Sequence, residues 1–328
     1  MLFCIRSFRR FILKDERMMF MCTAVSYLTK AHYFGRNLDL ERGYGEGVTI
    51  TPRNFPFSFR YGGECYEHSA LIGMAAVVRD YPLYFEATNE QGLSVAGLNF
   101  PGNAIYQPFA PEKINVAPFE LIPYVLVHCS CVSEAERELE WINVVDVSFS
   151  EDLPVSPLHW LISDRERSVV LECTASGLKL YENPYGVLTN NPTFDYHLMN
   201  IQNYGGLHEG ALSQKDYSLG MGAIGLPGDY SSASRFVRAV FVREKSVCDG
   251  SEAQSVNQFF RILGSVAMPN GCVRTPCGAF EYTRYSCCCN TETQTYYYTT
   301  YFDSAVRSVS VDEENRNGTR LRFAKIGQ

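Results

Sequence analysis

The sequence has no long apolar run and no excess of positive charge. None of its uninterrupted apolar stretches reaches the roughly 18 residues that a membrane-spanning helix requires. With a net charge of -7, the chain has no general basic surface, which argues against nucleic acid as a partner. A secretory signal peptide is also not expected, because charged side chains interrupt residues 1–21. We therefore expect a cytoplasmic protein with neither a membrane nor a nucleic acid as its partner.

Cysteine, in contrast, is abundant, with 12 residues. A secreted disulfide scaffold is not expected in a chain of 328 residues that has no signal peptide, so the thiols are predicted to be reduced. The segment His128-Cys129-Ser130-Cys131 resembles part of a metal site, but it ends the apolar run 121–127. Core packing at the end of a helix explains it better. We expect neither a metal nor a cofactor.

Cys22 is the candidate catalytic residue around which the rest of the chain is organised. An unperturbed thiol, with a pKa of about 8.5, needs a base at neutral pH, and an α-amino group with a pKa of about 8 can take and return that proton. A Cys22 that is the first residue of the mature chain carries both groups. Residues 26–28 and 32–40 predict a hairpin, which would place Arg36 and Asp39 beside Cys22. The guanidinium would favour the thiolate, and the carboxylate would hold the ammonium.

Residues 1–21 also do not fit a lipoprotein leader, because Met21 stands where a small residue would precede the cysteine. Two explanations remain: a propeptide that is removed before Cys22, or a reading frame that starts too far upstream. The second is favoured, since Lys14-Asp15-Glu16-Arg17 can be encoded by an almost all-purine run that resembles a bacterial ribosome-binding sequence. An aminopeptidase that removes Met21 would then expose Cys22, and residues 22–328 would form a single domain.

The order of the expected elements predicts an α+β fold. Strands are expected at 48–52, 57–61, 75–78, 93–98, 158–162, 168–173, 178–181, 295–302 and 306–311, and helices at 118–132, 133–142, 233–245 and 251–266. Ser133 and Glu136 would start the second helix with a capping box. Because strands and helices do not alternate regularly, the pattern favours large antiparallel sheets.

Three polar residues at the ends of expected elements are further site candidates. Asn99 ends a strand of small residues, which favours close approach of a ligand, although an asparagine that caps a turn explains it equally well. Asn190 ends a short strand, where a side-chain amide can donate to an oxyanion. Arg235 lies in the first turn of helix 233–245, where its charge opposes the helix dipole and indicates a role elsewhere.

Five motifs follow one another along the chain. They are Met21-Cys22-Thr23, Phe34-Gly35-Arg36-Asn37-Leu38-Asp39, Asn89-Glu90-x-Gly92-Leu93 through Gly97-Leu98-Asn99-Phe100-Pro101, Leu188-Thr189-Asn190-x-Pro192-Thr193-Phe194-Asp195, and Leu226-Pro227-Gly228-Asp229-x-x-x-Ala233-Ser234-Arg235-Phe236. Together they resemble the choloylglycine hydrolase family of bile salt hydrolases and penicillin V acylases. The resemblance implies an N-terminal-nucleophile hydrolase, with a four-layer αββα fold of two stacked antiparallel sheets between helices.

The resemblance also implies roles and a substrate. Position 99 tends to be asparagine in bile salt hydrolases and tyrosine in penicillin V acylases, so Asn99 favours glycine- or taurine-conjugated bile acids, cleaved through a thioester. The family suggests a homotetramer, with 205–225 as a contact. By position, Leu38, Tyr84 and Phe85 are candidates for the steroid pocket. The implied catalytic residues are the nucleophile Cys22, its neighbours Arg36 and Asp39, the oxyanion-hole residues Asn99 and Asn190, and the late arginine Arg235.

Several alternatives stay open. Within the family, the chain could act on penicillin V or on N-acyl homoserine lactones. It could instead be an inactive binding relative in which the extension stays on and Cys22 is never exposed. A Cys-His hydrolase could use His128 and Cys131, whose i,i+3 spacing places them on one helix face, although their apolar flanks argue for burial. His159, which lies between apolar neighbours, is expected to be a core residue and not a catalytic base.

Overall fold

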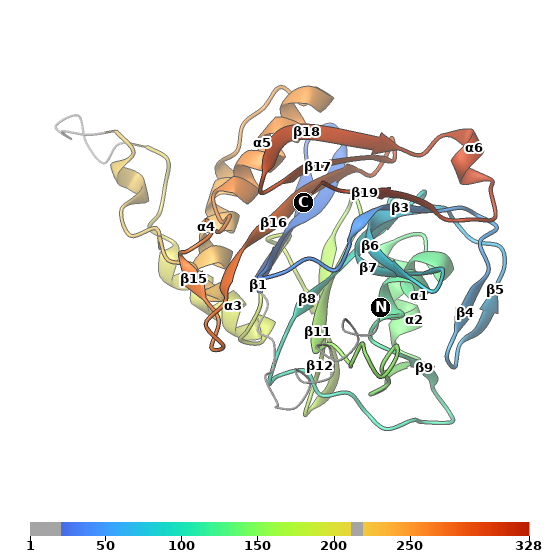
Figure 1. The fold of residues 1–328 in the computed structure, drawn as a ribbon. Coiled ribbons are helices and arrows are strands. Elements are labelled where there is room, and N and C mark those ends of the chain that lie inside the picture. Colours follow the sequence, from blue (N-terminus) through green and yellow to red (C-terminus); the bar gives the residue numbers. More distant parts are fainter. Residues whose placement is uncertain (1–20, 211–218, 328) are drawn as a thin grey trace, which may run out of the picture.

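Two antiparallel β-sheets packed face to face form the centre of the protein (Figure 1). The computed structural model describes residues 21–210 and 219–327. In spatial order, the first sheet consists of β14 (Val187–Leu188), β1 (Met21–Leu28), β2 (His32–Leu40), β16 (Phe280–Asn290), β17 (Thr295–Thr300) and β18 (Asp303–Ser310), with β15 (Val273–Arg274) paired to β16. The second sheet consists of β13 (Gly177–Glu182), β12 (Ser168–Thr174), β11 (Leu158–Ser163), β8 (Ser94–Asn99), β7 (Tyr81–Asn89), β6 (Leu71–Val78), β3 (Gly47–Thr51) and β19 (Arg322–Lys325).

Helices cover the outer face of each sheet, which completes four layers (Figure 1). Helices α4 (Ser232–Lys245) and α5 (Glu252–Gly264) pack on the first sheet, and α1 (Leu121–His128), with α2 (Val132–Leu139) beside it, packs on the second. The smaller elements are β4 (Phe57–Phe59), β5 (Gly63–Cys65), β9 (Ile114–Val116), β10 (Ile142–Val144), α3 (Phe194–Asn200), α6 (Glu313–Arg316), and the short helices η2 (Ile201–Tyr204) and η3 (Met221–Ala223). The predicted α+β, αββα architecture is confirmed.

The hairpin of β1 and β2 forms as the sequence predicts. Its turn closes with a hydrogen bond from the Thr29 amide to the Ala31 carbonyl, 2.9 Å long. The register places Cys22 opposite Leu38, and every residue of β2 is buried. The position of β2 explains this burial, because one face of the strand packs on the opposite sheet and the other lies under helices.

The two helices after β9 differ from the prediction. The first begins at Leu121, because the Glu120 carboxylate accepts the Ala117 amide at 3.2 Å and closes a turn just before the helix. Ser133 does not cap the second helix: the N-cap residue is Cys131, and no side chain caps it. The expected capping box is wrong, since Ser133 lies inside the helix and the Glu136 carboxylate accepts from Arg167 instead.

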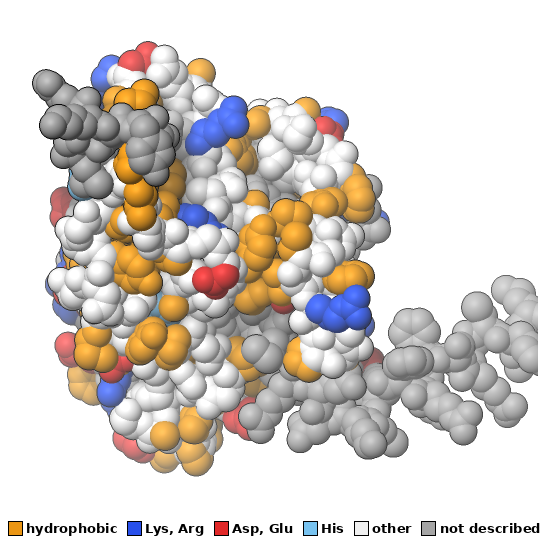
Figure 2. All heavy atoms as spheres, turned by 90° about the vertical axis from the view of Figure 1, so that its left-hand side faces the viewer, with side chains coloured by type: hydrophobic (Ala, Val, Ile, Leu, Met, Phe, Trp, Pro, Cys, Tyr) orange, Lys and Arg blue, Asp and Glu red, His pale blue; other side chains and the backbone are white. Residues whose placement is uncertain are grey.

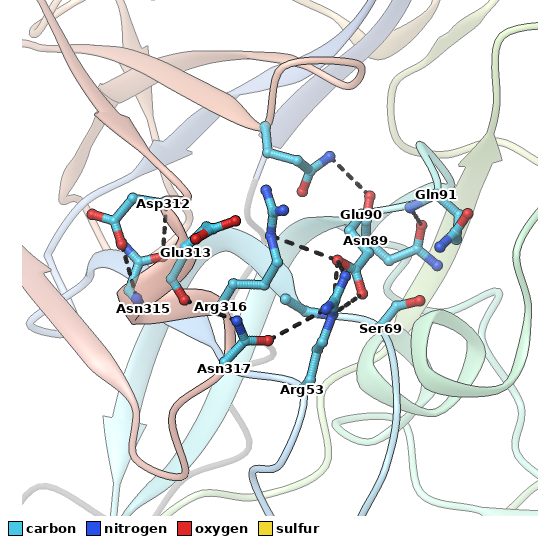
Figure 3. Close-up of polar contacts among 12 residues, drawn as sticks. Arg53, Ser69, Asn89, Glu90, Gln91, Asp312, Glu313, Asn315, Arg316 and Asn317 are labelled. Atoms are coloured by element: carbon cyan, nitrogen blue, oxygen red, sulfur yellow. Dashed lines mark hydrogen bonds and ion pairs between the residues drawn. The ribbon is translucent and has the colours of Figure 1, made fainter.

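A polar cluster joins the C-terminal segment to the turn between β7 and β8 (Figure 3). The Glu90 carboxylate lies 2.8 Å from Arg53 Nη2 and 3.7 Å from Arg316 Nε. Arg53 also donates to Asn317 Oδ1 at 3.3 Å. The side chain of Asn89 shapes the same turn by accepting the Leu93 amide at 3.0 Å. This cluster anchors the segment that leads into the edge strand β19.

Replacing Phe259 by alanine tests the packing of the helix layer. Phe259 is fully buried on α5, so the cavity should lower the free energy of unfolding by about 3–5 kcal/mol, measured by urea denaturation. Phe302→Ala is the matched control, because this phenylalanine is 68% exposed and its loss should change stability by only about 0.5 kcal/mol. Equal losses in the two variants would contradict the assigned layer.

Candidate active site

Cys22 is the second residue of β1, and its backbone amide donates to Asn190 Oδ1 at 2.8 Å. Asn190 follows β14, which pairs with β1 so that Leu188 lies opposite Ala24. The end of one strand therefore delivers an amide side chain to the start of its neighbour. The Cys22 side chain is buried.

The other end of the Asn190 amide reaches the second sheet. Its Nδ2 donates to the carbonyl of Asn99, the last residue of β8, at 2.8 Å. The backbone of Asn190 is also held on both sides: its N–H donates to Ser232 Oγ at 2.8 Å, and its carbonyl accepts from His197 Nε2 at 3.0 Å. Burial lowers the pKa of His197 to about 4, so this imidazole is neutral and carries its proton on Nε2.

Arg235 binds the same pair of residues from α4. One terminal nitrogen donates to the Cys22 carbonyl at 2.5 Å and to Thr23 Oγ1 at 2.7 Å, and the other donates to Asn190 Oδ1 at 2.8 Å. Its Nε donates to the Tyr230 carbonyl at 2.9 Å. Burial lowers the pKa of Arg235 below its usual value. The structure thus places this unfavourable first-turn arginine against Cys22 itself.

Arg36 crosses from the first sheet to the second. Its Nη1 donates to the carbonyls of Phe85 at 3.0 Å and Gly97 at 2.6 Å. The pairing of β6 with β7 shifts register here, and Phe85 is the extra residue of the resulting β-bulge. Burial alone would lower the pKa of Arg36. Acidic neighbours outweigh it and raise the pKa above the usual value; Cys22 has the largest of these effects, and Glu86 also contributes.

Two buried carboxylates face the start of β1. Burial raises the pKa of Asp39 to about 6 against the opposing charge of Arg235, and Asp39 Oδ1 accepts Thr283 Oγ1 at 2.6 Å. The Met21 amide donates to Glu281 Oε1, and burial raises the pKa of Glu281 to about 8. Within the described part of the chain, Asp39 Oδ2 has no hydrogen-bond partner.

The environment of the Cys22 thiol disfavours the thiolate. Burial raises its pKa, the nearby Arg36 guanidinium lowers it, and Asp39 raises it again, with a net rise above the usual value. A thiol with a raised pKa is protonated at neutral pH, so nucleophilic attack requires a base that removes its proton.

The expected pocket residues separate into two groups. Leu38 lies opposite Cys22 in the hairpin, and Phe85 packs against the core between the sheets, 6.3 Å from the ring of Tyr44. Tyr84 points to the other face of the second sheet, into the core under α1, where its hydroxyl contacts Thr51 Oγ1 at 2.7 Å. The structure does not bring Tyr84 to the Cys22 group, because the bulge at Phe85 changes which residues face the opposite sheet.

The alternative pair of His128 and Cys131 does not share a helix face, contrary to the spacing argument, because α1 ends at His128 and Cys131 precedes α2. His128 Nδ1 contacts the Tyr124 carbonyl at 2.8 Å. In residues 21–210 and 219–327, no group of three or more His, Cys, Asp and Glu side chains is arranged to hold a metal.

Sequence reasoning did not identify several residues that complete this site. Glu281 and Thr283 arrive on β16, and Glu86 arrives on β7. Their signal in the sequence is weak, since each is one polar residue within an expected or observed strand. Only the pairing between distant strands brings them to Cys22.

Around Cys22, a buried thiol near the start of β1, the Asn190 amide accepts from the backbone nitrogen and the Arg235 guanidinium donates to the backbone carbonyl. The chain belongs to the linear amide C–N hydrolases of the choloylglycine hydrolase family, whose sequence model matches residues 22–323.

Named relatives agree with this assignment. The bile salt hydrolase/transferase of Lactiplantibacillus plantarum is 48% identical over 92% of this chain and 95% of its own length. That of Clostridium perfringens is 36% identical over 94% and 98%. A crystal structure of a variant conjugated bile acid hydrolase from C. perfringens has a TM-score of 0.86, at 35% identity over 93% and 97%. The penicillin V acylase of Agrobacterium tumefaciens shares the fold, with a TM-score of 0.76 at 20% identity over 93% and 92%.

Glu281→Gln should change how stability depends on pH in the chain that retains Met21. The pKa of Glu281 is about 8 in the folded chain, against an ordinary value of 4.5. In the window between these two pH values the folded chain holds a proton that the unfolded chain releases, so the free energy of unfolding falls as the pH rises. A glutamine at this position cannot ionise, and the variant should gain about 1.4 kcal/mol over the parent for each pH unit within the window.

Urea denaturation of parent and variant between those two pKa values measures the difference. Phe302→Ala, which removes an exposed side chain without an ionisable group, serves as the control and should give a difference that does not change with pH. A pH-independent difference for Glu281→Gln as well would contradict the raised pKa.

Proposed function

We propose that the protein hydrolyses the amide bond of glycine- or taurine-conjugated bile acids with Cys22 as its N-terminal nucleophile. The observation that carries the proposal is the contact of the Cys22 nitrogen with Asn190 Oδ1 at 2.8 Å. In a chain that begins at Cys22, this nitrogen is the α-amine, and the amide oxygen holds it beside its own thiol.

Removal of the residues before Cys22 is part of the proposal. The family match begins at residue 22, and the pKa of the thiol is raised, so a base must be supplied. The freed amine supplies that base. Asp39 Oδ2, which has no partner among the described residues, offers an acceptor for the ammonium that forms.

The reaction then proceeds in two steps. The α-amine takes the thiol proton, and the sulfur attacks the substrate carbonyl carbon, so that the carbonyl oxygen becomes an oxyanion. Asn190 Nδ2 carries two protons, of which one binds the Asn99 carbonyl at 2.8 Å, and the second is available for the oxyanion together with the backbone of Asn99. The ammonium protonates the departing glycine or taurine nitrogen. Water then cleaves the thioester and releases the bile acid.

Two buried arginines favour an anionic substrate and a thiolate. The protein has a net charge of -7, so Arg36 and Arg235 must offset unfavourable long-range charge. Arg36 is the first group that lowers the pKa of Cys22 against its burial. Leu38 and Phe85 are proposed to contact the substrate.

The sequence identity to each group of relatives favours bile acids over penicillin V as the substrate. The named bile salt hydrolases share 36% and 48% of their residues with this chain, whereas the penicillin V acylase shares 20%. Asn99, where the acylases tend to have tyrosine, agrees with this choice.

The proposal also includes a compartment, the cytoplasm, and an assembly, the homotetramer. Every cysteine in the described ranges is a free thiol, as a reducing cytoplasm would keep it. None of the helices there has the length and apolar character that crossing a membrane requires. Residues 201–210 and 219–225, which follow α3, extend away from the sandwich (Figure 1). Residues 211–218 of the expected contact 205–225 lie outside the described residues. Hydrophobic side chains gather on this side of the molecule (Figure 2), with Met199 66% and Ile224 67% exposed. These features support a homotetramer, which sedimentation analysis checks.

Turnover of glycocholate, taurocholate and penicillin V by the purified protein tests the function. We expect release of glycine or taurine faster than cleavage of penicillin V, no activity in Cys22→Ala, and a loss of about 10²–10³ in kcat for Asn190→Ala. The exposed Cys272, replaced by alanine, is the control and should leave kcat unchanged.

The outcomes separate the alternatives. Faster cleavage of penicillin V would make the protein an acylase. Binding of conjugates without turnover, by a chain that keeps the residues before Cys22, would make it the inactive relative.

A further inference from the structure

His159 lies between the two strand ends that carry Asn99 and Asn190. It is a fully buried residue of β11, in the second sheet, and the pairing of β11 with β8 places Leu98 opposite it. The ring stacks on Phe100, with centroids 4.2 Å apart and planes within 7°. Phe100 directly follows Asn99, so this contact holds the end of β8.

The same imidazole also holds the end of β14 in the first sheet. Its Nε2 lies 2.9 Å from the carbonyl oxygen of Thr189, the residue before Asn190. A carbonyl only accepts, so Nε2 carries the proton and donates it. His159 therefore contacts the immediate neighbours of both residues that are proposed to form the oxyanion hole, one in each sheet.

Glu172 fixes the orientation of the ring. His159 Nδ1 lies 3.2 Å from Glu172 Oε1, which also accepts the Phe194 amide at 2.9 Å. Because Nε2 already donates to Thr189, one proton must lie between Nδ1 and Oε1, on either the imidazole or the carboxyl group. The ring therefore cannot flip without breaking hydrogen bonds at both of its nitrogens.

We propose that His159, oriented by Glu172, is a positioning residue that keeps the Asn190 amide and the Asn99 carbonyl in register across the two sheets. Its polar contacts are with Glu172 and Thr189, and it is assigned no contact with the reacting atoms. Its effect is geometric: a displacement of one strand end moves the oxyanion-hole donor away from the position where negative charge develops. This inference rests on the proposed hydrolysis, because the donor matters only to a reaction that forms an oxyanion.

His159→Leu removes both polar contacts while keeping an apolar side chain in the core. A misplacement of about 1 Å can cost about 100-fold in rate, so kcat should fall by about that factor. KM should stay nearly unchanged, because the lost interaction acts in the transition state. His159→Gln retains a donor that reaches Thr189 and should recover about tenfold of the loss. Alkylation of Cys22 by iodoacetamide should proceed at the parental rate, since the nucleophile is intact.

His32→Leu is the matched control. His32 is equally buried, but it lies at the far end of the β1–β2 hairpin and contacts Ser26 Oγ at 2.9 Å and Thr291 Oγ1 at 3.1 Å. Its replacement should lower stability and leave kcat at the parental value. A folded His159→Leu variant with parental kcat, or an equal loss of kcat in His32→Leu, would overturn the proposal.

Two further comparisons keep the test decisive. If His159→Leu does not fold, His159→Gln should exceed His159→Asn in kcat, because the shorter amide cannot reach Thr189, and equal rates would overturn the proposal.

If the wild type hydrolyses no conjugate, the proposed function fails, and crystal structures of the parent and the variants then test the positioning role of His159. In these, the 2.8 Å contact of Asn190 Nδ2 with Asn99 should lengthen in the variants that cannot donate to Thr189, and an unchanged contact would overturn the inference.

Discussion

The site depends on one amide side chain that joins the two sheets. The Asn190 oxygen accepts a hydrogen bond from the Cys22 backbone nitrogen, and the Asn190 nitrogen donates one to the Asn99 carbonyl, both at 2.8 Å. A primary amide is suited to this position, because it accepts at one end and donates at the other in a fixed plane. Arg235, Ser232 and the buried histidine His197 restrain Asn190 further, so its amide is held in one orientation.

The charges around this amide are costly to bury, and the fold compensates them in pairs across the interface between the sheets. Arg36 finds carbonyl acceptors in the second sheet, and Glu86 approaches Arg36 from there at 3.8 Å. Burial raises the pKa values of Asp39 and Glu281, so both carboxylates retain protons more readily than they would in water. A positive charge added at the start of β1, such as an α-ammonium at Cys22, would lower these pKa values and favour the ionised carboxylates.

The sequence predicted the parts of the site that depend on local pattern. The β1–β2 hairpin follows from two strand patterns and a polar turn, and Asn99 and Asn190 lie at strand ends because small and apolar runs stop there. The orientation of Tyr84 could not be predicted. In a regular strand, Tyr84 and Glu86 would share a face, but the bulge turns Tyr84 to the helices and Glu86 to Arg36. A bulge has no local signature here, and neither has the long-range pairing that delivers Glu281.

We propose that the working chain begins at Cys22, because only then do nucleophile and base belong to one residue. Intact-mass measurement of the purified protein, with N-terminal sequencing, tests this directly. We expect a chain whose first residue is Cys22 and whose α-amine is free. A fully active protein that retains Met21 or the residues before it would rule out this mechanism, because the proposed base would then be an amide nitrogen that cannot take a proton.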